Sequence, residues 1–146
     1  NSSIVMKNNQ LISITANFIN QNEVLGQIKK ILLTLRKQLD SAVPGSLHDA
    51  VQLINNNLDR DLNWKKFGVS FEEAYPGFFD RLLQVAPGLT LNEQKLCAYL
   101  LIRLSSREIA DVMNISLAAV NKNRQRLRKH LNLEPEADLS AYLGTL

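Results

Sequence analysis

Hydrophobic residues recur along the first third of the chain at alternating spacings of three and four. They occupy the two core positions of a heptad repeat over four heptads, with one polar interruption at Gln21. This period predicts one long helix, over residues 11–39, that buries an apolar seam against a partner. The seam consists of Leu11, Ile14, Phe18, Leu25, Ile28, Leu32, Leu35 and Leu39.

Two arrangements would bury this seam. A parallel homodimer is the preferred interpretation, with the polar interruption fixing the register of the two helices. Val24 and Ile31 flank the seam and make the stripe wider than a two-stranded coiled coil requires, so a short bundle within one chain is the alternative. The helix should end before the Pro44-Gly45 turn signal, which makes residues 1–43 the predicted dimerisation and signalling helix.

The region between the two Pro-Gly signals is predicted to be helical as well. Ser46 with Asp49, and Ser70 with Glu73, have the spacing of helix-capping pairs. We therefore expect residues 46–88 to form a helical connector. Its aromatic residues predict a core that joins the connector to its neighbours: Trp64, Phe67, Phe71, Tyr75, Phe78 and Phe79.

The C-terminal part of the chain contains three helix starts. Two have the S/T-x-x-E spacing of a capping box, in which a hydroxyl accepts from a backbone amide and a carboxylate reaches back. The starts predict helices over 91–103, 106–113 and 117–131, with a short turn before the last. Helix, short turn, helix is the plan of a helix-turn-helix DNA-binding unit. The capping residues are Thr90 with Glu93, Ser105 with Glu108, and Ser116, and the turn is Asn114, Ile115 and Ser116.

Charge is distributed unevenly along the 146 residues, which are 45% hydrophobic and 21% charged with a net charge of +3. Residues 89–133 hold eight basic and three acidic side chains, a net of +5, whereas residues 134–146 hold three acids and no base. Residues 119–130 carry five basic side chains and no acid. Such a concentration on one helix is the electrostatic footprint of a nucleic-acid binder.

Angular position divides this last helix into two faces. At about 100° per residue, Val120, Leu127 and Leu131 fall together and form the predicted buried face. Small, amide and basic side chains fill the opposite face, and such side chains contact base edges and phosphates. The predicted base contacts are Ala118, Asn121, Lys122 and Gln125, and the predicted phosphate contacts are Arg107, Arg126, Arg128 and Lys129.

The remaining candidate residues predict structural roles. Arg124 lies nearer the buried face, so we expect it to form an internal ion pair with Glu93 or Glu108. Cys97 is the only cysteine and lies in an apolar helical run, which indicates packing rather than nucleophilic chemistry. The chain shows no metal-ligand spacing, no cofactor motif, and no apolar run of the ~18 residues that span a bilayer. We therefore predict no enzyme activity, metal, cofactor or membrane contact.

The C-terminal segment resembles the LuxR/NarL-type helix-turn-helix family without a gap over about 45 residues. This resemblance implies a tetrahelical domain whose positions 121, 122 and 125 face the bases. Two residues depart from it: Arg103 stands where the family often has Gly, and Asn121 where Lys or Arg is frequent, so base preference does not carry over. The matching residues are Leu89, Thr90, Glu93, Ser105, Glu108, Ile109, Ala110, Ile115, Ser116, Val120 and Leu127.

The stretch FEEAYPGFFDRLLQVAPGLTLNEQKLCAYL resembles the segment that precedes this domain in bacterial sensor-regulators. Those proteins carry a periplasmic propeller, a triple-tyrosine module, a membrane span and a cytoplasmic coiled coil. The resemblance implies that the chain is the cytoplasmic end of a longer, membrane-anchored protein and that upstream sensor domains control it.

Together these observations predict an all-α protein with a long coiled-coil-like helix, a middle helical region and a C-terminal tetrahelical helix-turn-helix domain. The domain is expected over residues 89–133, followed by an acidic tail at 134–146. The predicted function is a dimeric, cytoplasmic transcription regulator that binds double-stranded DNA through the major groove. The alternative is a sigma-factor-like or protein-interaction module. A regulator dimer should bind a two-fold operator alone, whereas a sigma-like module would require core polymerase.

Overall fold

The computed structural model describes residues 2–39, 45–57 and 60–146, and every regular element within these ranges is an α-helix. The predicted all-α class is confirmed. The helices are α1 (Ser2–Gln38), α2 (Gly45–Asn57), α3 (Arg60–Ala74), α4 (Phe78–Val85), α5 (Leu91–Leu101), α6 (Ser106–Met113), α7 (Leu117–His130) and α8 (Leu139–Leu143).

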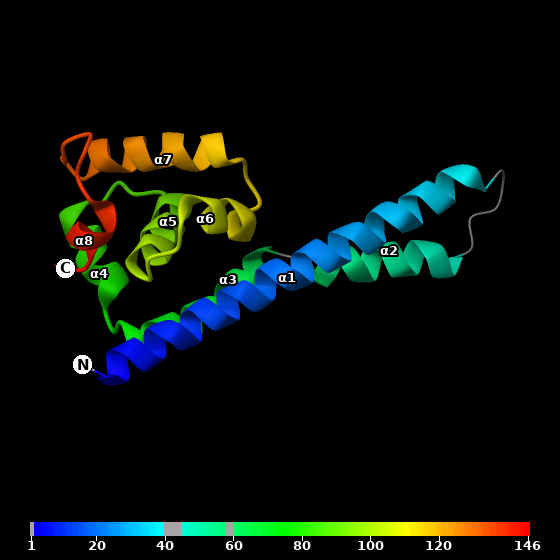
Figure 1. Cartoon of the computed structure of the whole chain (residues 1–146), viewed down its shortest axis with the longest axis horizontal. Helices are drawn as coiled ribbons and strands as arrows, with labels where there is room; N and C mark the ends of the chain where they lie inside the picture. The colour runs from blue at the N-terminus through cyan, green and yellow to red at the C-terminus, as the bar shows by residue number, and fades with distance from the viewer. Residues whose placement is uncertain (1, 40–44, 58–59) are drawn as a thin grey trace.

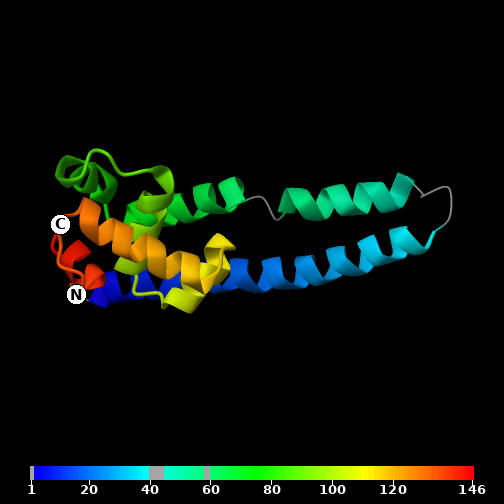
Figure 2. The ribbon, with the colours of Figure 1, turned by 90° about the horizontal axis from the view of Figure 1, so that it is seen from above.

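The long helix α1 runs the length of the molecule, and α2 and α3 run back along it (Figure 1, Figure 2). The N-terminal half of α1 lies with α3 beside the group formed by α4 to α8. The other half of α1 and α2 form a helical hairpin that projects from this body. None of the described helices combines the length and the apolar content that a membrane crossing requires.

One continuous apolar core holds the body together. It includes Leu11 of α1, Phe67 and Phe71 of α3, and buried residues of every later helix. The ring of Trp64 stacks on Phe67 with ring centroids 5.4 Å apart and meets Tyr99 of α5 edge-on at 5.9 Å. The predicted aromatic joint is confirmed, and it places α3 and α4 in the same packed body as the C-terminal helices rather than in a separate connector.

The predicted seam on α1 divides between two environments. Leu11 is 1% exposed within the core, so its side chain is covered within one chain, and Phe18 is partly buried against the same core. Ile28, Leu35 and Leu39 are 41%, 47% and 47% exposed. The alternative of a bundle within one chain therefore describes the first part of the seam. The remaining seam residues, Ile14, Leu25 and Leu32, are half-buried.

α2 begins at Gly45, within one residue of the predicted start at Ser46. The predicted start at Ser70 is wrong, because Ser70 lies inside α3. This error has a packing cause, since the buried pair Phe67 and Phe71 faces the core one turn apart and carries the helix through Ser70. The predicted stop at Pro44 lies outside the described residues, and α1 ends at Gln38.

Residues 134–146 are part of the C-terminal domain and not a tail. They contain α8, whose Leu139 and Leu143 are 0% and 1% exposed in the core, and α8 packs on α5. The side chain of Asp138 accepts a hydrogen bond from the Ala141 amide at 3.1 Å and so caps the helix. The boundary predicted at residue 133 is therefore too early, and α8 is the fourth helix of the predicted tetrahelical domain.

Candidate nucleic-acid interface

The three helices of the helix-turn-helix region begin where their caps predict. Thr90 accepts from the Glu93 amide at 3.2 Å, and Ser105 accepts from the Glu108 amide at 3.1 Å. Both carboxylates reach back to the capping residue's own amide, so both capping boxes are complete. Ser116 accepts from the Ala119 amide at 3.0 Å at the start of α7. Local hydrogen bonds thus fix the first turn of α5, α6 and α7.

The turn between α6 and α7 depends on a left-handed residue. Asn114 has φ 54° and ψ 51°, a conformation that Asn tolerates better than most side chains do. The amide of Ile115 then donates to the carbonyl of Ala110 at 3.0 Å, which closes the end of α6. The predicted turn is confirmed, and it redirects the chain within three residues so that α7 crosses α6.

The same device ends α5 and α7. Arg103 has φ 65° after α5, and Asn132 has φ 57° after α7. In each case the next amide donates to a carbonyl five residues back, at 3.1 Å from Leu104 to Tyr99 and at 2.8 Å from Leu133 to Arg128. Arg103 is the position where the resembled family often has Gly, and its positive φ gives a physical reason for that preference.

The inner face of α7 is the one predicted. Val120 and Leu127 are fully buried and Leu131 is 5% exposed, and α7 contacts α6 and α5 through this side. Figure 1 shows α7 on the far side of α5 and α6 from α1, at the edge of the molecule. The outer face of α7 therefore points away from the long helix.

The outer face of α7 carries basic and amide side chains without an acid. The predicted base contacts are all solvent-exposed, and so are three of the four predicted phosphate contacts. At about 100° per residue, those on α7 share one exposed face of the helix. The exposed residues are Ala118, Asn121, Lys122, Gln125, Arg126 and Lys129 on α7 and Arg107 on α6.

Arg128 differs from the other predicted phosphate contacts. Its side chain is half-buried, and its Nε donates to the carbonyl of Ala137 at 2.9 Å. The chain returns past this side of α7 on its way to α8, a path that the sequence pattern did not predict. Arg128 therefore ties α7 to the segment before α8, and we remove it from the proposed phosphate contacts.

Arg124 has a structural role, but not with the predicted partners. Its Nη1 donates to the hydroxyl of Ser106 on α6 at 2.8 Å, and burial lowers the pKa of its guanidinium. The predicted ion pair with Glu93 or Glu108 is wrong. The carboxylate of Glu108 caps α6, and that of Glu93 caps α5 and bonds to an imidazole.

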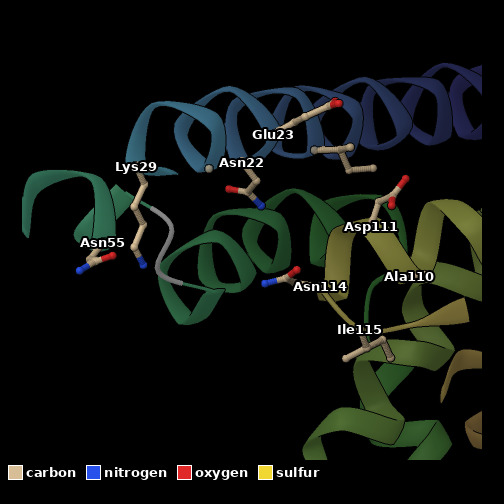
Figure 3. A pocket seen from close by; sticks show the side chains of 10 residues that line it. Asn22, Glu23, Lys29, Asn55, Ala110, Asp111, Asn114 and Ile115 are labelled. Carbon is tan, nitrogen blue, oxygen red and sulfur yellow. The ribbon is translucent and has the colours of Figure 1, made fainter. Parts of the chain in front are cut away.

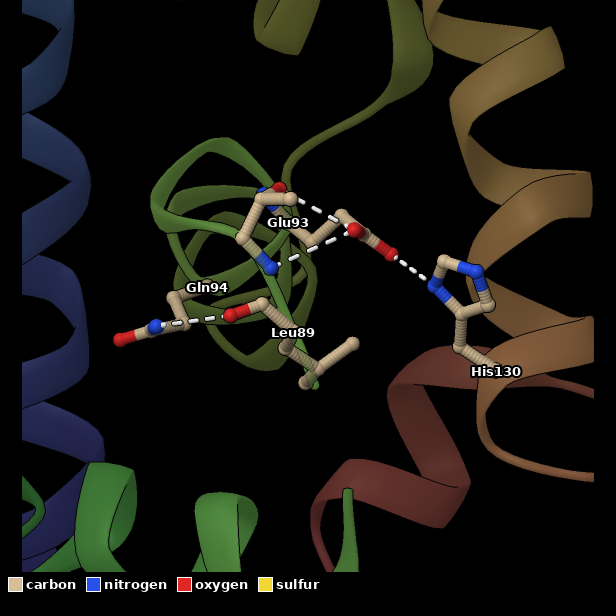
Figure 4. Close-up of polar contacts among 5 residues, drawn as sticks. Leu89, Glu93, Gln94 and His130 are labelled. Carbon is tan, nitrogen blue, oxygen red and sulfur yellow. Dashed lines mark hydrogen bonds and ion pairs between the residues drawn. The ribbon is translucent and has the colours of Figure 1, made fainter. Parts of the chain in front are cut away.

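That imidazole belongs to His130, in the last turn of α7. Its Nδ1 lies 2.5 Å from Oε2 of Glu93, whose side chain is 10% exposed (Figure 4). Burial alone would raise the pKa of the Glu93 carboxyl, but the hydrogen bonds from His130 and Thr90 outweigh burial and lower this pKa. The pair connects the beginning of α5 to the end of α7 and so fixes the angle at which α7 is presented.

A cleft of about 580 Å³, lined by polar and apolar residues, lies between the projecting hairpin and the helix-turn-helix region (Figure 3). α1 contributes Asn22, Glu23 and Lys29, while α6 and the turn after it contribute Asp111 and Asn114. None of these polar side chains is buried, and the lining includes none of the predicted base contacts. The hairpin therefore approaches the unit from the α6 side and leaves the outer face of α7 uncovered.

Comparison of the chain with protein-family models, with curated proteins and with solved structures identifies no match. The case for a function therefore depends on the residues and geometry of this chain.

Proposed function

We propose that the chain is a sequence-specific DNA-binding transcription regulator in which α7 enters the major groove and α6 braces it across the backbone. The observation that carries this proposal is the acid-free outer face of α7, exposed at the edge of the molecule behind a capped helix-turn-helix. The 14 residues of α7 span about 21 Å, and a helix of this kind fits a major groove about 12 Å wide.

The side chains on this face divide into two chemical groups. Asn121 and Gln125 are amides that can each form two hydrogen bonds to adenine, and Lys122 can donate to guanine. Ala118 is small enough for a close approach to a thymine methyl. These four residues would read sequence, because only base edges in the groove carry sequence information.

The exposed cations around them would hold the phosphate backbone. Arg107 on α6, and Arg126 and Lys129 on α7, are placed to do so after the removal of Arg128. Phosphate contacts of this kind supply salt-dependent affinity that does not depend on sequence. The motif resemblance to the LuxR/NarL type supports the same division of roles and extends the proposal to a dimer, at the cytoplasmic end of a larger signalling protein, on a two-fold operator.

The division of roles is tested by selecting bound DNA from a random pool with the purified chain alone. The Gln125→Ala variant should relax preference at one base pair, by about 1–3 kcal/mol, because one direct readout is lost. The Lys129→Ala variant should weaken binding to all sequences about equally and reduce the salt dependence.

Glu136→Ala is a matched control, since Glu136 is an exposed residue in the segment between α7 and α8. It should leave sequence preference unchanged. Identical preference profiles for the Gln125 and Lys129 variants would refute the division of roles. Binding that appears only with core polymerase would favour a sigma-like module instead.

A further inference from the structure

One side of α1 carries no charged residue. At about 100° per residue, the six charged side chains of this helix all lie outside an arc of about 160°. Within that arc, from Met6 to Gln38, the chain has only apolar and uncharged polar side chains. The charged residues on the remaining arc are Lys7, Glu23, Lys29, Lys30, Arg36 and Lys37.

The distal half of this uncharged face is an exposed apolar stripe. Val24, Ile28, Ile31 and Leu35 are 54%, 41%, 60% and 47% exposed. Their spacing of four, three and four is that of a heptad seam. Ile28 and Leu35 belong both to this stripe and to the predicted seam. In place of Leu25 and Leu32, the stripe contains the residues just before them, Val24 and Ile31. The shift arises because α2 packs against α1, on the side where Leu25 and Leu32 are half-buried.

α2 extends this stripe. Leu53 is 64% exposed and lies beside Val24 in an open groove of about 540 Å³ between the two helices. The buried residue Ile54 lines the same groove, and the rest of the lining is apolar or uncharged: Asn20, Gln21, Leu25 and Asn57. The hairpin thus presents an apolar stripe and an uncharged groove beside it that the described parts of the same chain do not cover, and exposed apolar surfaces mark interaction sites.

We propose that a second copy of this chain covers the stripe, so that two α1–α2 hairpins form a four-helix bundle. In a two-fold interface each patch meets its own copy, so a charged patch would repel itself. An uncharged face that stays uncharged over the whole length of α1 suits such pairing. It offers no ionic group by which a charged partner would be recognised.

The uncharged face of α1, taken over its whole length, is comparable in area to one side of a standard interface, and the apolar stripe forms its distal half. The 37 residues of α1 extend about 55 Å, and an arc of about 160° on a helix about 10 Å wide gives on the order of 800 Å². A standard protein interface buries about 800 Å² on each partner. Leu53 on α2 adds to this area.

The two α1 helices run parallel in this arrangement. A parallel pair places both C-terminal units at the same end of the bundle, where two copies of α7 can reach one DNA duplex. An antiparallel pair would place them at opposite ends of helices about 55 Å long. The choice of direction rests on the proposed DNA-binding function, whereas the interface itself does not.

The first experiment is the solution mass of the full chain by light scattering. Wild type should weigh about twice the 16.5 kDa of one chain, and Ile31→Glu should reduce this to one chain. Lys30→Glu is the matched control, because Lys30 is the exposed neighbour on the charged side, and it should remain dimeric. Both side chains are exposed within one chain, so neither change should disturb the fold. A monomeric wild type, or a dimeric Ile31→Glu, would overturn the interface.

Direction is tested by an engineered disulfide. In a parallel two-fold pair Ile31 meets its own copy, so Ile31→Cys should form a cross-linked dimer on oxidation, whereas Lys30→Cys should not. Cys97 will not interfere because it is fully buried. Equal cross-linking of both variants, or of neither, would overturn the parallel bundle.

The outcomes separate the interface from the DNA-binding function. If selection recovers no DNA while the mass results hold, the interface stands and the proposed function fails. If wild type is monomeric yet binds a single half-site, the proposed function stands and the interface fails.

Discussion

Glu93 is the residue that connects the most parts of the C-terminal domain. It completes the capping box of α5 and also bonds to His130 at the end of α7, 37 residues later. A helix N-terminus favours a carboxylate and a helix C-terminus favours an imidazolium, so the pair joins two ends of favourable polarity. The sequence identified this side chain as a cap and as a candidate partner of Arg124, but not as the partner of His130.

Replacing Glu93 by Gln tests this connection. Gln preserves the geometry of a capping box, so the substitution removes the charge that faces His130. We expect the free energy of unfolding at pH 7 to fall by about 1 kcal/mol. Because the pKa of Glu93 is lowered in the folded protein, this difference should be complete above the ordinary carboxyl pKa of about 4.3. It should disappear as the pH falls through the folded-state pKa.

Denaturant titrations at several pH values measure this difference. Glu108→Gln is the control, because Glu108 caps α6 without an imidazole partner and should show a smaller loss at pH 7. A loss for Glu93→Gln that persisted unchanged at pH 2.5 would contradict the role of the charge.

Arg103 offers a test of backbone conformation at a single residue. Its φ of 65° costs an L-residue energy that Gly avoids, while Gly loses more entropy on folding. We expect Arg103→Gly to leave the free energy of unfolding unchanged or to raise it by up to ~1 kcal/mol. Arg107→Gly, inside α6, should lower it by about 1 kcal/mol. Equal losses for the two variants in thermal unfolding would argue against the left-handed conformation at Arg103.

At the scale of elements, α8 shows how a short helix completes the domain. Its five residues are too few to be stable alone, yet Leu139 and Leu143 are buried and Asp138 caps the first turn. Arg128 binds the segment that leads into it. Residues 134–146 therefore contact α7 through Arg128, and their three acids do not form a separate tail.

The burial of Leu139 gives the corresponding prediction. Leu139→Ala should lower the free energy of unfolding by about 2–5 kcal/mol, since it removes a fully buried side chain from the core. Leu91→Ala is the matched control, because Leu91 is 55% exposed in the first turn of α5, and its loss should stay below about 1 kcal/mol. Urea titration of both variants distinguishes them. Similar losses would mean that α8 is not part of the core.

At the scale of the whole molecule, α1 serves two structures at once. Its first half belongs to the core that carries the helix-turn-helix region, through Leu11 and Phe18. Its second half pairs with α2 in the projecting hairpin, where Val51 and Ile54 are the buried residues of α2. A rigid helix that spans both regions would transmit a change in the hairpin directly to the base of the helix-turn-helix.

Two substitutions on α1 should therefore behave differently. Leu11→Ala should lower the free energy of unfolding by about 2–5 kcal/mol at every protein concentration, because the lost contacts lie within one chain. Ile31→Ala should lower stability only in a manner that depends on protein concentration, because its contacts are proposed to lie between chains. Thermal unfolding over a hundredfold range of concentration tests the contrast. A concentration-dependent effect of Leu11→Ala would place Leu11 in the interface after all.

The helix-turn-helix was predictable almost residue by residue, because its signals are local. Thr90, Ser105 and Ser116 cap the helices that they precede, and Asn114 adopts the left-handed turn. α8 could have been found by the same means, from Asp138 before two leucines at helical spacing. In contrast, the partners of Arg124 and Arg128 lie on other elements, and only the path of the chain brings Ser106 and Ala137 to them.

The sequence by itself determined the three capped helices α5, α6 and α7 and the two faces of α7, since capping and helical period act over a few residues. Only the tertiary structure decided which apolar residues of α1 are covered within the chain and which stay exposed. A heptad pattern indicates that a surface is buried, but it does not identify what covers that surface. The hydrophobic effect is non-directional and does not select a particular partner. The packing of α2 and α3 on one side of α1 covers Leu11 and leaves Val24 and Ile31 exposed.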